Sequence, residues 1–409
     1  MKIAIIGGGA GGMMCGALLA NGGVTTTIFD GNEKLGKKLY ITGKGRCNLT
    51  NACAPNEFLE NVVRGKKFMF SSINCFSSFD CMEFFEDNGL KLKVERGNRV
   101  FPESDKSSDV IKVLQKLNSK NEVRLNCNVK DVKKLGDRFL VITEAGQQEF
   151  DKVVVSTGGV SYQSTGSTGD GYKIGRKFGH TVVKQVPALV AIELGDKFVP
   201  DLQGLSLKNV TLSARFMNEA GKEETKCLFG EMLFTDKGIS GPIVLSMSSI
   251  INRSKSVTLS LDFKPALTEQ QLDARLLRDF DENKNRNLSY IIAGLLPKSV
   301  VNAFLDRTGI TGEKKVNSVT KEERQKIIQT LKNFSLDYRG LYPIESGIVT
   351  SGGVDTNEIN PKSCESKLCP GLYFIGEVLD IDCLTGGFNI QVAFSTAYAC
   401  AQDLLSKLN

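Results

Sequence analysis

The 409-residue sequence contains a single histidine, His180. One imidazole excludes metal sites built from several histidines. It also excludes Ser-His-Asp and Cys-His catalysis unless His180 is itself the base. His180 follows Lys177, Phe178 and Gly179, a pattern typical of a helix end. We therefore expect a capping or surface role for His180 rather than a catalytic one.

Cysteine pairs at metal-binding or redox spacing are also missing. None of the 11 cysteines belongs to a C-x-x-C motif, so the sequence predicts no metal site. An odd number of cysteines in a long chain favours a reducing, cytoplasmic location. No apolar run reaches the ~18 residues of a membrane span, so no membrane association is expected. Glycines interrupt the apolar start of the chain, which argues against a signal peptide.

The charge balance gives little support to a nucleic-acid partner. The net charge is only +6, and the basic clusters are short. A nucleic-acid-binding surface would need a broad basic stripe. We therefore expect a small-molecule substrate and no nucleic acid, while the oligomeric state stays open. A hydrophobic content of 41% and a charged content of 24% are ordinary for a soluble globular chain.

The first thirty residues carry the strongest pattern in the chain. A short apolar run predicts a buried parallel strand, and a glycine-rich turn, a helix and a second strand follow it. These segments are Ile3–Ile6, Gly7–Gly12, Met13–Ala20 and Thr25–Phe29, and the second strand ends at Asp30. The order is that of a βαβ dinucleotide-binding unit.

Each part of this unit has a physical role. Gly7 permits the tight turn, Gly9 lets a pyrophosphate approach the backbone, and Gly12 lets helix and strand pack closely. The helix N-terminus offers free N–H groups to the phosphates. Asp30 lies about 20 residues beyond the glycines, where an acid can accept hydrogen bonds from ribose hydroxyls.

A second glycine-rich loop, Gly36–Asn51, directly follows the ribose-binding acid. It is not a Walker A loop, because its Gly-Lys pair is followed by glycine rather than Ser or Thr. Arg46 in this loop could bind a phosphate or a carbonyl-rich ring. Cys47 has no partner at a known redox spacing, and a buried small residue is the simpler interpretation.

The C-terminal region predicts a second half-site. Leu372–Ile375 is an apolar strand that ends in Gly376 and Glu377, and Gly386–Gly387 open an apolar helix. A helix N-terminus preceded by glycines can bind an anion or a carbonyl group. Glu377 can hold ribityl hydroxyls. Two half-sites at opposite ends of the chain can bind one long ligand. The sequence contains no second dinucleotide-binding fingerprint, so no separate nicotinamide-binding domain is expected.

Between these ends the pattern changes several times. The sequence predicts mainly helix over residues 56–89, antiparallel hairpins over 129–150, and a buried strand at 151–156. Short alternating strands over 187–261 indicate an all-β unit. Residues 268–331 are charged and helical in pattern.

The chain resembles the YhiN/BaiN-like flavoproteins, also described as aminoacetone-oxidase-family or NAD(P)/FAD-dependent oxidoreductases. The matching stretches span nearly the whole chain: Gly36–Asn51, Arg99–Pro102, Gly166–Tyr172, Met232–Pro242 and Gly371–Phe394. The resemblance implies FAD and an α/β fold, in which a glutathione-reductase-like FAD-binding Rossmann domain carries an inserted β-barrel domain and a small helical insert.

The expected division is residues 1–187 and 350–409 for the FAD-binding domain, 188–267 and 332–349 for the β-barrel domain, and 268–331 for the helical insert. Asp236 stands where the family often has histidine, so the resemblance supplies no proton donor there.

The resemblance also implies roles for individual residues. Asp30 would bind the adenosine ribose, Val129 would contact the adenine through its backbone, and the segment from Arg46 would lie along the ribityl chain and flavin. The full set of expected cofactor-binding residues is Gly7, Gly9, Ala10, Gly11, Gly12, Asp30, Lys38, Gly43, Arg46, Cys47, Asn48, Val129, Thr157, Gly158, Gly376, Glu377, Asp380, Gly387, Phe388, Asn389 and Ile390. Catalytic residues stay unassigned, with Arg46 and Tyr162 as weak candidates for a proton donor.

The leading functional prediction is an FAD-dependent oxidoreductase that moves a hydride between the flavin and a small organic substrate, an amine or a conjugated enone. NAD(P)H is a candidate transient electron donor, and oxidase and reductase activity both stay open. The alternatives are a flavin-bearing RNA-modifying protein and a non-catalytic redox-sensing flavoprotein.

Overall fold

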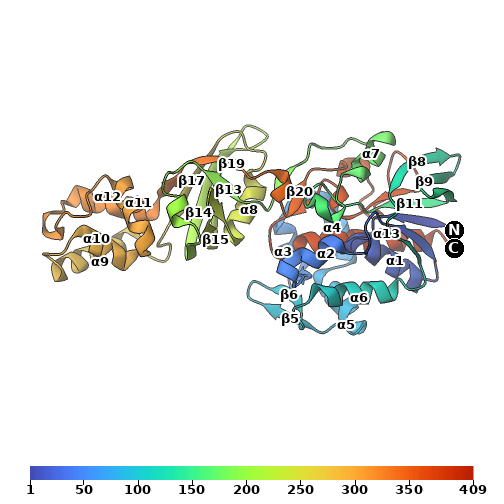
Figure 1. The fold of residues 1–409 in the computed structure, drawn as a ribbon, viewed down its shortest axis with the longest axis horizontal. Helices are drawn as coiled ribbons and strands as arrows, with labels where there is room; N and C mark the ends of the chain where they lie inside the picture. Colours follow the sequence, from blue (N-terminus) through green and yellow to red (C-terminus); the bar gives the residue numbers. More distant parts are fainter. Residues whose placement is uncertain (409) are drawn as a thin grey trace. The chain divides into compact units, whose positions relative to one another are not determined.

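The computed structural model describes residues 1–408, which divide into two compact units. The first unit contains residues 1–188 and 343–409, and the second contains residues 189–342. Figure 1 shows the elements of both units. The structure groups the helices of residues 269–332 with the sheet of the second unit, so the three-part division expected from the sequence stays a prediction.

The first unit is built on a five-stranded parallel sheet. β1 is a central strand paired on both edges, and all four side chains of its IAII sequence are buried, as in a parallel sheet covered on both faces. In sheet order the strands are β21 (Leu372–Phe374), β11 (Lys152–Val155), β1 (Ile3–Ile6), β2 (Thr26–Phe29) and β7 (Glu122–Arg124). The predicted βαβ unit at the N-terminus is confirmed.

Two helices of the first unit pack against each other beside this sheet. They are α1 (Ala10–Asn21) and α13 (Phe388–Ser406), from opposite ends of the chain (Figure 1). A Cβ atom on Gly11 would lie 3.0 Å from Ser156 Oγ and 3.4 Å from the Ala393 carbonyl oxygen of α13. Small residues on α1 therefore let both the sheet and α13 approach its first turn.

The other elements of the first unit surround this centre. The three-stranded sheet β10-β9-β8 confirms the hairpins expected over residues 129–150. The remaining helices are α2 (Lys37–Ile41), α3 (Pro55–Glu60), α4 (Lys66–Cys75), α5 (Ser78–Asp87), α6 (Ser107–Leu117) and α7 (Asp170–Lys177). The remaining strands are β3 (Thr50–Asn51), β4 (Val62–Arg64), β5 (Leu92–Glu95), β6 (Arg99–Pro102), β8 (Val129–Leu135), β9 (Arg138–Thr143), β10 (Gly146–Phe150), β12 (Val186–Ala188), β20 (Val349–Ser351) and β22 (Asp382–Cys383).

One part of the helical expectation for residues 56–89 is wrong. Strand β4 interrupts the helices because it pairs with β22, with Arg64 opposite Asp382. The next residue, Gly65, has a φ of 77°, a left-handed conformation that glycine adopts without steric cost. A pairing with a strand more than 300 residues away leaves no signal in the local helical pattern.

The second unit contains a seven-stranded sheet with antiparallel pairing throughout. Along β14, buried residues recur at nearly every second position, with a break at the bulge near Asn209, as a sheet with one buried side requires. The order is β18 (Phe334–Leu336), β17 (Val257–Asp262), β14 (Ser206–Met217), β15 (Glu223–Phe234), β16 (Gly238–Ser240), β13 (Ile192–Leu194) and β19 (Tyr338–Leu341). The strands expected over residues 187–261 are confirmed, but the all-β expectation is wrong in part, because α8 (Pro242–Ile251) lies within that range. Closure of this sheet into a barrel stays a prediction.

Helices complete the second unit. They are α8 (Pro242–Ile251), α9 (Glu269–Glu282), α10 (Leu288–Leu295), α11 (Val301–Thr308) and α12 (Lys321–Lys332). Capping boxes at Thr268 and Thr320 fix where α9 and α12 begin. Rings of Phe263 and Phe304 contact Phe334, so helices and sheet share one core. Among the described residues, no helix combines the length and the apolar character that crossing a bilayer requires.

Candidate dinucleotide site

The carboxyl ends of the parallel strands bring the two predicted half-sites together. Gly7 follows β1, Asp30 follows β2, Thr157 lies two residues beyond β11, and Gly376 lies two residues beyond β21. Because these strands are parallel neighbours, all four residues lie at the same edge of the sheet. Ligands of open α/β sheets bind at this edge.

The glycines of the turn have different surroundings. A Cβ atom on Gly12 would lie 1.9 Å from the Gly7 carbonyl oxygen, so Gly12 is required for the contact between strand and helix. A Cβ atom on Gly9 would meet no atom within 4 Å. Gly9 is the N-cap of α1, where backbone N–H groups have no partner within the helix. The open space therefore lies at the point where these groups can bind a phosphate.

Asp30 is held in place by hydrogen bonds to its carboxylate. Its Oδ2 accepts from the Gly8 N–H at 2.7 Å, and its Oδ1 accepts from Asn32 N and Nδ2 at 2.8 and 2.9 Å. Oδ1 already accepts two hydrogen bonds, whereas Oδ2 can accept one more, so a ribose hydroxyl can still bind there. The Cys127 N–H donates to the Asp30 carbonyl at 2.9 Å, which brings the start of β8 and Val129 towards this corner.

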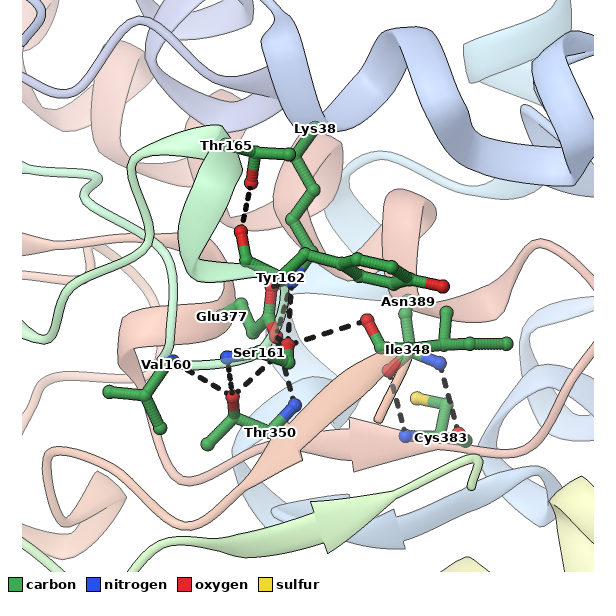
Figure 2. Close-up of polar contacts among 10 residues, drawn as sticks. All are labelled: Lys38, Val160, Ser161, Tyr162, Thr165, Ile348, Thr350, Glu377, Cys383 and Asn389. Atoms are coloured by element: carbon green, nitrogen blue, oxygen red, sulfur yellow. Dashed lines mark hydrogen bonds and ion pairs between the residues drawn. The ribbon is translucent and has the colours of Figure 1, made fainter. Parts of the chain in front are cut away.

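Lys38 and Glu377 form a half-buried ion pair from opposite ends of the chain (Figure 2). Lys38 Nζ lies 2.9 and 2.8 Å from the two carboxylate oxygens of Glu377 and donates to Ser161 Oγ at 2.9 Å. Glu377 Oε1 also accepts from the Thr350 N–H at 2.9 Å. Glu377 is therefore engaged by protein donors, although its carboxylate can still accept a ribityl hydroxyl.

Ser161 and Thr350 are site residues that the sequence prediction missed. Thr350 Oγ1 accepts from the backbone N–H groups of Val160 and Ser161 at 2.9 and 3.1 Å (Figure 2). They are small polar residues, Ser161 in a loop and Thr350 in strand β20, and no local pattern links them. They fix the loop that carries Tyr162.

Arg46 lies in an ionic cluster. Its Nε donates to Asp105 Oδ1 at 2.7 Å, its Nη2 pairs with Glu95, and its guanidinium lies 4.1 Å from the centre of the Phe101 ring. The hydrogen bonds to Glu95 and Asp105 raise the pKa of Arg46 above its ordinary value. A higher pKa makes Arg46 a weaker acid, which argues against it as a proton donor.

Other expected ligands contact the protein itself. Burial raises the pKa of the Cys47 thiol to about 12, which suits a structural thiol. The ring of Phe388 is buried against Phe58. The amide of Asn389 bonds to the backbone of Cys383, accepting at 3.0 Å and donating at 2.9 Å (Figure 2). The side chains of Phe388 and Asn389 therefore contact the protein at the N-terminus of α13. A ligand at this helix end would bind to backbone N–H groups.

The remaining expected residues line the same loops. Gly43 and Gly158 have φ angles of 57° and 72°. In the orientation that satisfies both polar atoms of its amide, Asn48 donates to Thr50 O and accepts from the Gly387 N–H at 3.0 Å. This contact joins the Gly43–Asn48 loop to the start of α13. Ala10 begins α1, and Ile390 packs on the core from the first turn of α13.

Asp380 binds an arginine of the same unit. Arg64 Nε and Nη2 donate to its two carboxylate oxygens at 3.0 and 2.9 Å, and the Asp380 side chain is only 10% exposed. Such a bidentate pair is geometrically specific. Asp380 therefore fixes β4 beside the β21–α13 connection, and a role as a cofactor ligand stays a prediction.

Arg64→Lys is expected to destabilise the first unit by about 1.5 kcal/mol, because lysine keeps the charge but loses one charge-assisted hydrogen bond. The measurement is the urea midpoint at constant m-value. Arg138→Lys is the control, since the Arg138–Glu149 pair is 44% and 47% exposed and should change stability by less than about 0.5 kcal/mol. Equal effects of the two substitutions would contradict the special role of the Arg64–Asp380 pair.

The surface role expected for His180 is wrong, whereas the capping role is confirmed for its backbone, since the His180 N–H donates to the Gly175 carbonyl at the end of α7 at 3.0 Å. His180 is 4% exposed and hydrogen-bonds through both ring nitrogens, to Glu358 at 3.1 Å and to Ser366 at 2.8 Å. The residues that bury it, including Phe374, come from a segment nearly 200 residues later in the chain. Only the helix end before His180 was visible in the sequence.

The residues at the sheet edge fit a bound dinucleotide. Gly9 leaves open space at the helix N-terminus. Among residues 1–408, Thr157 Oγ1 and Tyr172 Oη are buried and have no hydrogen-bond partner. Thr157 follows β11 at the ligand-binding edge. A Cβ atom on Gly171 would lie 2.2 Å from the Thr157 Oγ1, so Thr157 is close to the start of α7, where Tyr172 lies. Buried hydroxyls without partners are costly unless a ligand or water satisfies them.

Comparison with known proteins agrees with this reading. The family model of the HI0933-like protein Rossmann domain matches residues 1–403. A ribosomal RNA dihydrouridine synthase of Escherichia coli (strain K12) is 32% identical over 406 residues, which cover 98% of this chain and 97% of that protein. A 3-dehydro-bile acid delta(4,6)-reductase of Clostridium scindens is 30% identical over 413 residues, with 97% of each chain covered.

The fold is also seen in a solved structure. The open conformation of a flavocytochrome c3 fumarate reductase aligns with a TM-score of 0.51 at 16% identity, over 99% of this chain and 78% of that one. At this identity the likeness shows the fold alone. The match over residues 1–403, with relatives that align along nearly their whole length, identifies the chain as a member of the HI0933-like family.

Proposed function

We propose that the protein is an FAD-dependent reductase of carbon–carbon double bonds conjugated to a carbonyl group. The observation that carries the proposal is that Gly9, Asp30 and Glu377 lie at one shared edge of the parallel sheet, where they could hold the two halves of one long dinucleotide. The family and the fold support FAD as this dinucleotide. Gly7–Gly12 would hold the pyrophosphate, Asp30 the ribose, and the start of α13 the flavin end.

The names of the relatives support the reaction class. Conversion of uridine to dihydrouridine saturates a double bond conjugated to a ring carbonyl. A delta(4,6)-reductase of a 3-dehydro compound acts on double bonds conjugated to the 3-keto group. In both reactions a hydride is added to an electron-poor carbon conjugated to the carbonyl group, the β-carbon of an enone or the δ-carbon of a dienone, and a proton is added to a carbon nearer the carbonyl, so both belong to one reaction class.

Bound FAD would supply the hydride, with NADH or NADPH proposed as the source of its two electrons. The protein residues would bind and orient the substrate and exclude water from it. Arg46 is ion-paired to two carboxylates, so we propose that the proton comes from water or from a hydroxyl group rather than from its guanidinium.

The test is anaerobic reoxidation of the reduced flavin by defined acceptors. The arms are an unmodified ribosomal RNA transcript, free uridine and 4-androstene-3,17-dione. The matched controls are dihydrouridine and the saturated androstane-3,17-dione, which keep the carbonyl groups but lack the double bond. We expect fast reoxidation with at least one unsaturated acceptor, a product two hydrogens heavier, and none with the controls. A reduced flavin that none of the unsaturated acceptors reoxidises would contradict the proposal.

Uridine in RNA is a second candidate substrate, favoured by the Escherichia coli relative and by a second ribosomal RNA dihydrouridine synthase, from Haemophilus influenzae, that is 30% identical over 409 residues. The net charge of +6 gives only modest attraction to phosphates. If RNA is the substrate, its binding should weaken as salt rises, whereas binding of a neutral enone should not.

A further inference from the structure

Tyr162 has a backbone conformation that is unusual for an aromatic residue. Its φ and ψ are 51° and 55°, in the left-handed region that mainly glycine and asparagine occupy. The conformation is maintained because the Tyr162 carbonyl accepts from Thr165 N at 2.8 Å and from Thr165 Oγ1 at 2.7 Å (Figure 2). Residues kept in such conformations by their surroundings cluster at ligand sites.

The residues before Tyr162 tie it to the candidate flavin end of the site. The N–H groups of Val160 and Ser161 bond to Thr350, and Ser161 Oγ accepts from Lys38 at 2.9 Å. Ser161 Oγ also donates to the Ile348 carbonyl at 3.4 Å. Ser161 contacts the Lys38–Glu377 pair directly, and Tyr162 is the next residue in the chain. The backbone position of Tyr162 beside this pair is therefore fixed.

The Tyr162 ring forms part of an apolar surface beside this pair. Figure 2 shows the ring projecting from the loop on the side of Ile348. Tyr162 is half-buried, and Ile348 is 37% exposed. Among residues 1–408, the Tyr162 hydroxyl has no hydrogen-bond partner, whereas the backbone on both sides of Tyr162 is fixed.

We propose that Tyr162 is a stacking platform that binds the flat face of a conjugated ring substrate and so determines substrate specificity. The inference rests on the proposed function and adds a residue to it. An aromatic ring with a fixed backbone binds a planar ring at low entropic cost, since two χ angles alone remain to be ordered. The left-handed backbone directs the Tyr162 ring towards Ile348. This conformation lowers the stability of the folded protein, and in return the ring has a defined position for the substrate.

The experiment compares Tyr162→Phe, Tyr162→Leu and Tyr162→Gly in the FAD-bound protein. The dissociation constant of the acceptor that reoxidises the flavin is measured with the oxidised protein, from the change in flavin absorbance, and KM and kcat are measured separately. Phenylalanine keeps the platform, so affinity should change less than twofold. Leucine and glycine should weaken binding about 10-fold, within the range for loss of one stacking contact.

Thermal unfolding gives a second readout. Tyr162→Gly removes the left-handed strain, so its Tm should equal or exceed that of the wild type while its affinity falls. Asn209→Gly is the control, since Asn209 has a φ of 56° on an exposed bulge of β14 in the second unit. It should leave affinity, KM and kcat unchanged.

The outcomes separate the two proposals. If the wild-type protein reduces no conjugated double bond, the proposed function fails and the inference fails with it. If it does and Tyr162→Gly binds the acceptor normally, the stacking role alone is wrong. A large fall in kcat for Tyr162→Phe with normal affinity would also overturn stacking and would assign the hydroxyl to proton transfer.

Discussion

Gly9→Val is expected to give a folded protein that binds no detectable FAD. Gly9 has φ and ψ of −76° and −165°, an extended conformation that valine adopts readily. A side chain there would meet no protein atom within 4 Å of its Cβ, so the fold should tolerate it. The same side chain would occupy the space that the pyrophosphate needs at the N-terminus of α1. The flavin-to-protein ratio and the circular dichroism spectrum measure the two effects.

The neighbouring glycine provides the contrast. Gly12→Val should prevent normal folding, because its Cβ would lie 1.9 Å from the Gly7 carbonyl oxygen and the backbone there cannot move freely. Loss of FAD from a misfolded protein would say nothing about the ligand, whereas loss from folded Gly9→Val would. Normal flavin content in Gly9→Val would show that the dinucleotide lies elsewhere. Release of FMN rather than FAD from the wild type would contradict the adenosine half-site at Asp30.

The N-terminal half of the site could be predicted because its chemistry is local. Gly7, Gly9, Gly12 and Asp30 lie within one βαβ unit, and each is required by backbone geometry or by a phosphate. The strand order of the sheet follows from parallel pairing around β1. The apolar run at Leu372–Ile375 correctly indicated a strand of the same sheet, because a strand buried on both faces must be apolar throughout.

The other half depends on contacts that have no local signal. Lys38 and Glu377 are 339 residues apart, and Ser161 and Thr350 are 189 apart. A lysine in a loop is usually solvated, so the sequence could suggest Lys38 as a ligand but not its carboxylate partner. Asp380 illustrates the same limit. Its role as a cofactor ligand stays a prediction, and no local pattern could indicate the bidentate pair with Arg64, 316 residues away, that the structure shows.

His180 shows how a local pattern can mislead. The helix end before it is real, since α7 ends at Lys177. The ring nevertheless lies inside the protein, where Glu358 Oε2 is 3.1 Å from Nδ1 and Ser366 Oγ is 2.8 Å from Nε2. The Glu358 oxygen also accepts from the Thr181 N–H at 2.8 Å. A carboxylate on Nδ1 favours the tautomer in which Nδ1 carries the proton and Nε2 accepts from the serine.

This order of acid, imidazole and hydroxyl is that of a nucleophilic triad, but the serine is not free to react. Ser366 Oγ also accepts from the backbone N–H groups of Leu368 and Cys369 at 3.1 and 2.8 Å. Both lone pairs are therefore occupied and the proton is donated to His180, so no electron pair is available for attack. The three side chains instead fix the 358–369 segment against the end of α7.

The acid stability of the protein should depend on this cluster. Burial lowers the pKa of His180 below its ordinary value, and the hydrogen bond to Glu358 offsets only part of that effect. The unfolded chain, with a His pKa near about 6.5, then binds a proton more readily than the folded one. The contribution of neutral His180 to the free energy of unfolding is fully present above about pH 6.5. It decreases as the pH falls below that value, until the pH reaches the lower pKa of His180 in the folded protein. Glu358, whose pKa is lowered, titrates in a separate and more acidic range.

His180→Leu is therefore expected to reduce the free energy of unfolding by about 2–4 kcal/mol at neutral pH, since Glu358 and Ser366 each lose a buried partner worth about 1–3 kcal/mol. Its stability should also lose the pH dependence just below about pH 6.5 that the wild type shows. His180→Asn keeps a donor towards Glu358 and serves as the milder variant for kinetics. With FAD bound, it should lower the rate of flavin reduction by less than about 10-fold, well short of the ~100-fold loss that removal of a general acid or base causes. A loss of that size in a folded, FAD-containing variant would place the imidazole in the chemistry and contradict its role as a structural clamp.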